Sequence, residues 1–200
     1  MIKIAVMASG RGTNLQAIID SAKKGEINGK IEIVISDNPN AFALKRARDN
    51  HITTKAFPYR QYKNKDEYEQ NIFNCLESYN ISLIVLAGYM RLLGSRIIKE
   101  YRHRIINIHP ALLPSFPGLH AQRQAIEYGV KVSGCTVHFV DEGMDTGPII
   151  LQKSVEVKQT DDEETLSDRI LEFEHKLLPR AIQLFAQNRI DVRNNKVYIK

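Results

Sequence analysis

Apolar and polar residues alternate in blocks along the first half of the chain. Short apolar runs that predict strands lie at residues 2–7, 31–35, 53–57 and 83–87. Between them, apolar residues at three- and four-residue spacing predict helices over about residues 15–24, 41–50 and 65–79. Strand, helix and strand in repetition is typical of a parallel sheet with helices on both faces. The pattern therefore predicts a doubly wound α/β fold with a mostly parallel sheet.

The second half departs from this repeat. Its expected elements are a strand over residues 104–108, a proline-rich loop over 109–118, a short helix over 120–128, and strands over 132–140 and 149–157 around a glycine-rich turn. The segment Thr160-Asp161-Asp162-Glu163 is interpreted as a capping box that opens a long terminal helix. We expect that helix to reach about residue 188 and to end or bend at Pro179, because proline cannot donate the helical hydrogen bond.

Composition is that of one ordinary folded domain. The chain has 200 residues, of which 43% are hydrophobic and 26% charged, and no repeat, low-complexity tract or linker divides it. We therefore expect a single domain over residues 1–200. The most apolar run, residues 81–87, is far shorter than the roughly 20 residues that cross a bilayer. With no signal peptide visible, this predicts a cytoplasmic protein without membrane contact.

The formal net charge of +5 raises the possibility of a nucleic-acid partner. No run of five basic residues occurs and no aromatic-rich platform accompanies the scattered cations, so we expect no nucleic-acid partner. A mild positive field suits small anionic substrates.

Cys75 and Cys135 are expected to be buried thiols. The histidines form no metal-binding pattern, so no metal is predicted.

The loop after the first predicted strand, Ser9-Gly10-Arg11-Gly12-Thr13-Asn14, opens a helix. Its backbone N–H groups would converge where the helix dipole favours an anion, and its glycines allow close approach. The third glycine position of a dinucleotide fingerprint is Leu15, so a monophosphate fits better than a dinucleotide. Asp37 follows the second strand, where a ribose-binding acid would lie, and keeps an oxidoreductase open as the weaker alternative.

Three further side chains are candidates for acyl-transfer chemistry. Asn107 and His109 lie two residues apart at the end of a predicted strand, so both point to the same side. An amide can steady an oxyanion and an imidazole can move protons. Asp145, in the glycine-rich turn, could orient the histidine and favour its protonated form. Among the other histidines, His120 could support the site and His138 is expected to be half-buried in a strand.

Three motifs together resemble the folate-dependent formyltransferases. They are Asn107-Ile108-His109-Pro110, the loop 112–118 and Asp145-Thr146-Gly147-Pro148. The likeness to members that formylate glycinamide ribonucleotide extends over essentially the whole chain, including residues 9–16, 87–93, 120–125 and 134–141. It implies a Rossmann-like formyltransferase fold, with the phosphate-binding half first and the folate and catalytic half second.

The resemblance also implies a role for each matching residue. Asn107, His109 and Asp145 match the catalytic trio of the family. The residues that would hold the substrate phosphate and ribose are Gly12, Thr13, Asn14 and Glu174; those at the folate site are Lys65, Met90, Arg91, Leu92 and Leu93. Two positions depart from the family pattern: Lys65 stands where arginine is common, and Ala111 where serine is usual.

The implied reaction moves the formyl group of 10-formyltetrahydrofolate, a cosubstrate, to the amine of glycinamide ribonucleotide in purine biosynthesis. The amine would attack the formyl carbon directly, through a tetrahedral intermediate that Asn107 and protonated His109 stabilise. Family members with an added RNA-binding or regulatory domain share the trio, but the phosphate loop and the chain length argue against both. A homodimer is left open.

Overall fold

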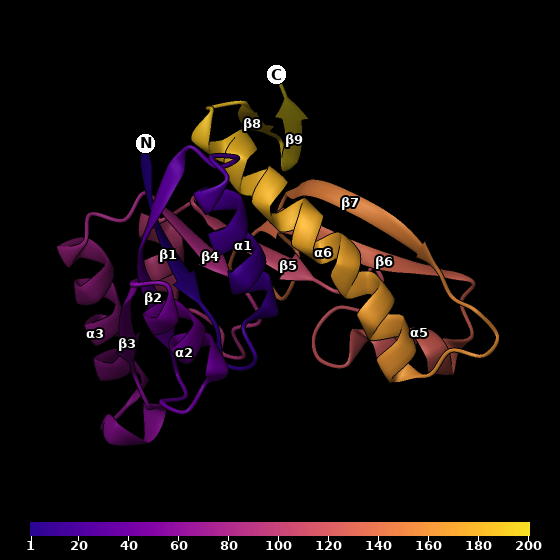
Figure 1. The fold of residues 1–200 in the computed structure, drawn as a ribbon, viewed down its shortest axis with the longest axis horizontal. Helices are drawn as coiled ribbons and strands as arrows, with labels where there is room; N and C mark the ends of the chain where they lie inside the picture. The colour runs from indigo at the N-terminus through magenta and orange to yellow at the C-terminus, as the bar shows by residue number, and fades with distance from the viewer.

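The computed structural model describes all 200 residues and contains one large sheet. Its strands are β1 (Ile2–Met7), β2 (Gly29–Ser36), β3 (Thr53–Ala56), β4 (Leu83–Leu86), β5 (Ile105–His109), β6 (Val132–Phe139) and β7 (Ile149–Glu156). They lie in the order β3-β2-β1-β4-β5-β6-β7 (Figure 1). Pairing is parallel from β3 to β5, and β6 and β7 are antiparallel additions. The prediction of a doubly wound, mostly parallel α/β sheet is confirmed.

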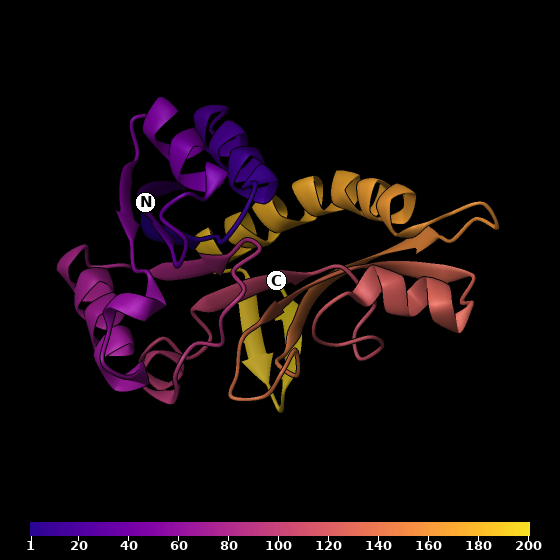
Figure 2. The ribbon, with the colours of Figure 1, turned by 90° about the horizontal axis from the view of Figure 1, so that it is seen from below.

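Helices cover both faces of this sheet. They are α1 (Thr13–Lys23), α2 (Phe42–Asp49), α3 (Lys65–Ser78), α4 (Ser95–Glu100), α5 (Ala121–Tyr128) and α6 (Glu163–Ala186). Alternate residues of β1 face opposite layers: Ile4 and Val6 join the core beneath α1, α2 and α6, whereas Ala5 and Met7 join the core beneath α3 and α4. Figure 2 shows these two helical layers on either side of the strands.

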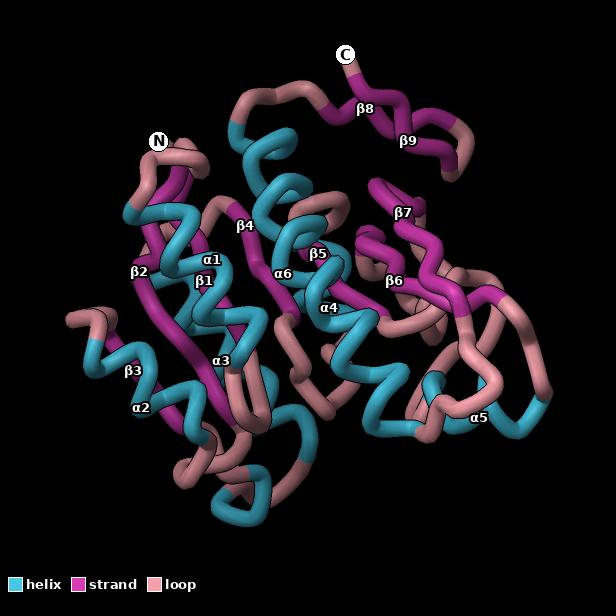
Figure 3. The backbone as a smooth tube through the Cα atoms, turned by 45° about the vertical axis from the view of Figure 1, so that its right-hand side comes forward, coloured by secondary structure: helices cyan, strands magenta, loops and turns pink.

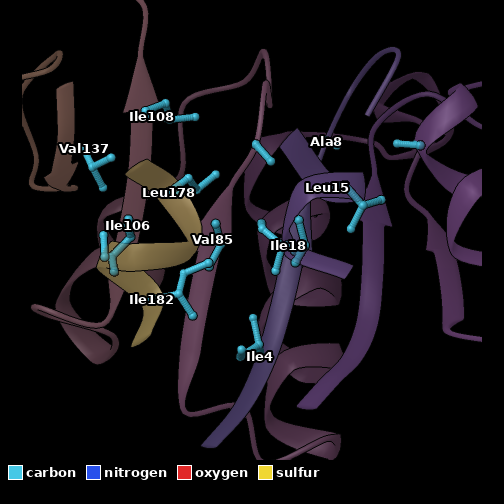
Figure 4. Close-up of a cluster of buried hydrophobic side chains, with 14 of the residues drawn as sticks. Ile4, Ala8, Leu15, Ile18, Val85, Ile106, Ile108, Val137, Leu178 and Ile182 are labelled. Carbon is cyan, nitrogen blue, oxygen red and sulfur yellow. The ribbon is translucent and has the colours of Figure 1, made fainter. Parts of the chain in front are cut away.

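The larger core lies between α1, α6 and the centre of the sheet. Ile18 of α1 and Leu178 and Ile182 of α6 are fully buried with Val85 and Ile106 of the sheet (Figure 4). Burying each such aliphatic side chain contributes about 1.5–3 kcal/mol. This packing holds α6 against α1, and so brings Glu174 to the first turn of α1.

The terminal helix begins and continues differently from the prediction. Asp162, not Thr160, is the N-cap: its side chain accepts a hydrogen bond from the Thr165 N–H at 2.8 Å, and the Thr165 hydroxyl closes the capping box. Pro179 lies inside α6 and does not end it. Its neighbours Leu178, Ala181 and Ile182 are fully buried, and this packing offsets the roughly 3 kcal/mol that an internal proline costs.

Two features were not predicted from the sequence. Helix α4 is short, and a second, two-stranded sheet of β8 (Ile190–Arg193) and β9 (Lys196–Ile199) follows α6. Figure 3 shows this hairpin beyond the end of α6, beside β7. No helix in the structure is long and apolar enough to cross a membrane.

Candidate active site

The predicted catalytic side chains meet at the carboxyl end of β5. The antiparallel register of β5 and β6 places Asn107 opposite His138 and His109 opposite Thr136. Asn107 Nδ2 lies 3.2 Å from His138 Nε2. Asn107 and His109 are two residues apart on the strand, as predicted, and the turn between β6 and β7 brings Asp145 to both histidines.

Asp145 lies between two imidazoles. Its Oδ2 is 3.4 Å from His109 Nδ1, and its Oδ1 is 3.6 Å from His138 Nε2. The Gly118 N–H donates a 2.8 Å hydrogen bond to Oδ2. Burial acts to raise the pKa of Asp145, but His138, the Gly118 N–H and His109 outweigh it and hold the pKa below its ordinary value. Asp145 is therefore a carboxylate at neutral pH, held at a backbone φ of 56°.

His109 is buried, with only 4% of its surface exposed. Burial lowers its pKa more than the Phe116 carbonyl and Asp145 raise it, and His138 lowers it further. The free chain therefore favours a neutral imidazole. Its Nε2 lies 2.8 Å from the Phe116 carbonyl, which can only accept, so Nε2 carries the proton and Nδ1 faces Asp145.

His138 is the site residue that sequence reasoning missed. It was expected to be half-buried, but it is 2% exposed and contacts both Asn107 and Asp145. Its Nδ1 lies 2.8 Å from the carbonyl of Phe139, which can only accept, so Nδ1 carries a proton and Nε2 faces Asn107 and Asp145. A histidine between Val137 and Phe139 in a predicted strand was the available signal. His120, by contrast, pairs with Glu163 at 3.7 Å and does not contact the trio.

The predicted phosphate loop forms the N-terminus of α1. Gly12 is the N-cap, in the left-handed region at φ 71°, and no side chain caps the helix. The N–H groups of the first turn, at Thr13 and Asn14, are thus left for a ligand. A Cβ on Gly12 would lie 2.7 Å from Ala43 Cα, whereas one on Gly10 would meet nothing within 4 Å. Position 12 therefore requires glycine because the loop packs closely against α2 there. Position 10 has free space for a side chain.

Asn14 and Glu174 meet across 160 residues of sequence. Asn14 Nδ2 donates a 2.8 Å hydrogen bond to Glu174 Oε2, while Asn14 Oδ1 is buried without a partner. Burial raises the pKa of Glu174, and the Asn14 amide lowers it by less. The structure thus joins two residues predicted to hold one substrate, and leaves an unpaired acceptor beside them for a ligand hydroxyl.

The predicted folate residues are Lys65, the first residue of α3, and the segment Met90–Leu93 after β4, and they divide into two groups. Lys65, Leu92 and Leu93 line a cavity of about 540 Å³, together with Val140 and Met144 of the turn before Asp145. Met90 and Arg91 are not part of its lining. The Arg91 Nε donates a 3.1 Å hydrogen bond to Asp37, and its guanidinium lies 4.5 Å from the centre of the Tyr59 ring. No group of three or more His, Cys, Asp or Glu side chains gathers at metal-binding distance.

Comparison with known proteins identifies the family. The sequence profile of the formyl transferase family matches residues 2–182. A phosphoribosylglycinamide formyltransferase of Bacillus subtilis is 47% identical over 183 residues, which is 92% of this chain and 94% of that protein. The human trifunctional purine biosynthetic protein adenosine-3 is 43% identical over 96% of this chain, which corresponds to 19% of that longer protein.

Solved structures agree with the sequence relatives. The crystal structure of glycinamide ribonucleotide transformylase 1 from Symbiobacterium toebii superposes with a TM-score of 0.98 at 47% identity, covering 100% of this chain and 94% of that one. The oxidoreductase and nucleic-acid alternatives are therefore set aside. The chain belongs to the formyl transferase family, and it aligns along nearly its whole length with phosphoribosylglycinamide formyltransferases of that family.

Proposed function

We propose that this chain transfers the formyl group of 10-formyltetrahydrofolate to the amine of glycinamide ribonucleotide, a step of purine biosynthesis. The supporting relatives carry this activity in their names and match the chain along most of its length. We further propose that residues 1–200 form one formyltransferase domain. A cytoplasmic location fits the biosynthetic role of the relatives.

The observation that carries this proposal is the order of three neighbouring strands. β1, β4 and β5 are adjacent and parallel, so their carboxyl ends share one edge of the sheet. The phosphate loop follows β1, the folate segment follows β4, and Asn107 and His109 end β5. Ligands of open α/β sheets bind outside the carboxyl ends of the strands. One edge therefore offers an anion site, a cavity lined by both polar and apolar side chains, and an acyl-transfer cluster.

The geometry supports direct transfer between the two substrates. The substrate amine attacks the formyl carbon, and Asn107 Nδ2 and His109 Nε2 donate hydrogen bonds to the oxygen as it becomes negative. For His109 this exchanges the Phe116 carbonyl for the formyl oxygen. The neutral imidazole of the free chain gains a proton more readily once this negative charge develops beside Asp145, because both anions favour the cation.

The reaction ends when the bond between the formyl carbon and the folate nitrogen breaks. The amine loses one proton and the leaving nitrogen gains one, so the transfer is proton-neutral. Asp145 is ionised and lies 3.4 Å from His109 Nδ1, so it stabilises the imidazolium once Nδ1 is protonated, and it can relay the proton to the leaving nitrogen through water. No serine or cysteine is paired with a base in this cluster, so no covalent enzyme intermediate is invoked.

Formyl transfer is tested by mixing the purified chain with both substrates and omitting each in turn. The proposal expects formylglycinamide ribonucleotide and tetrahydrofolate in equal amounts, only when both substrates are present. Equal rates of deformylation with and without the amine substrate would show hydrolysis instead, and no consumption of the formyl donor would refute the proposal.

A further inference from the structure

Asp37 has no place in the site described above, although it lies at the same edge of the sheet. It follows the last residue of β2, and its side chain is 13% exposed. Both carboxylate oxygens are engaged. Ser9 Oγ donates to Oδ1 at 2.5 Å, and Arg91 Nε donates to Oδ2 at 3.1 Å.

Ser9 is the first partner of this carboxylate and lies directly before the phosphate loop. Its Oγ also accepts a 2.9 Å hydrogen bond from the Met90 N–H, and its own N–H donates to the Gly88 carbonyl at 3.0 Å. Ser9 therefore holds the exit of β1 to the segment that follows β4. These are the segments from which the phosphate loop and the folate residues arise.

Arg91 is the second partner, and its side chain, 38% exposed, packs against tyrosine rings. Its guanidinium lies over Tyr59 at 4.5 Å and near Tyr68 at 5.8 Å from the ring centres. The Tyr68 hydroxyl is bonded to that of Tyr89 at 2.5 Å. Opposite charge, hydrogen bonding and ring contacts thus fix Arg91 outside the cavity, while Leu92 and Leu93 line it.

We propose that Asp37 is a positioning residue that ties the phosphate loop to the folate segment, so that binding at either site strengthens binding at the other. This inference rests on the proposed function for the identity of the two ligands. A ligand that restrains one loop also restrains the other, because both are bonded to the same carboxylate through Ser9 and Arg91. The second ligand then meets a site that is already ordered, which is positive coupling without a large movement.

The coupling is measured by calorimetric binding rather than by turnover. The probes are ribose 5-phosphate for the phosphate loop and 5-formyltetrahydrofolate for the cavity, each titrated with and without the other. In the wild type we expect each probe to tighten the other by at least about fivefold, the lower end of typical coupling. Asp37→Asn keeps the shape of the side chain but loses its charge. In this variant both affinities fall by about tenfold, and neither probe changes the affinity for the other, a coupling factor of about one.

Two further variants separate positioning from folding. Ser9→Ala removes the bridge to the phosphate loop but keeps the Arg91 ion pair, so it also abolishes the coupling. The double variant with Asp37→Asn then adds no further loss of coupling. Asp49→Asn is the matched control, because Asp49 makes an exposed ion pair with Lys45 on α2. It retains wild-type coupling.

Steady-state kinetics supply the second readout. Asp37→Asn raises KM for both substrates, and kcat at saturation stays within about twofold, because Asp37 touches neither reacting group. A wild type without coupling, a variant that weakens one probe alone, or a lower kcat with unchanged KM values would each overturn the inference. Coupling in a wild type that transfers no formyl group would instead refute the proposed function and leave the inference standing.

Discussion

Replacing Asp145 by asparagine tests whether this carboxylate acts on His109 or only shapes the turn. Asparagine is nearly isosteric and tolerates the left-handed backbone at φ 56°. Its side-chain oxygen can still accept from the Gly118 N–H. The change therefore removes one negative charge 3.4 Å from His109 Nδ1 and little else.

The size of the effect follows from Coulomb's law. At this separation, two unit charges interact by about 1 to 5 kcal/mol for effective dielectric constants of about 80 to 20. Removing the carboxylate should thus lower the pKa of His109 further, beyond the depression that burial already causes. A histidinium that forms in the transition state loses the same stabilisation, so kcat should fall by about 10- to 1,000-fold.

The assay combines a pH–rate profile with NMR titration of His109 in both proteins. The His109 titration should move to lower pH in the variant, and the loss should fall on kcat rather than on KM. Asp191→Asn is the matched control, since Asp191 pairs with Arg193 on the C-terminal hairpin. Wild-type kcat together with an unmoved His109 titration would show that Asp145 is only a turn residue.

Four other substitutions test the remaining features. His109→Ala should reduce turnover by at least about 100-fold and, because His109 is buried, also lower the urea midpoint; turnover within a few fold of wild type would remove it from the mechanism. Gly12→Ala should destabilise the fold by about 1–3 kcal/mol through its contact with Ala43, whereas Gly10→Ala should keep the melting temperature and raise KM for glycinamide ribonucleotide; equal stability of the two variants would contradict this. Burial raises the pKa of Glu174, so its stabilising protonated form is fully present below about pH 4.5 and is lost as the pH rises through the folded-state pKa. Glu174→Gln should therefore melt at higher temperature than wild type at pH 8 and lose that advantage towards pH 4; a constant difference in melting temperature would refute the buried-acid interpretation.

The sequence alone determined the order of the main elements and part of the site. Strands β1 to β7 and helices α1, α2, α3, α5 and α6 lie within a few residues of their predicted bounds, because apolar periodicity is a local property of the chain. Asn107 and His109 share a side of β5 because strand residues alternate. The phosphate loop was visible because a glycine-rich turn between strand and helix forms from neighbouring residues.

Only the tertiary structure decided which distant residues complete the site. His138 faces Asn107 through the β5–β6 register, and no local pattern specifies an antiparallel register between segments thirty residues apart. Asp37 joins Ser9 to Arg91 because β2, β1 and β4 are neighbours in the sheet. Packing also set the sign of the His109 pKa shift: the sequence suggested a carboxylate partner that favours the cation, but burial among β5, β6 and the proline loop outweighs that partner. Charge, hydration and strand register depend on the whole fold, and they determine how these side chains can act.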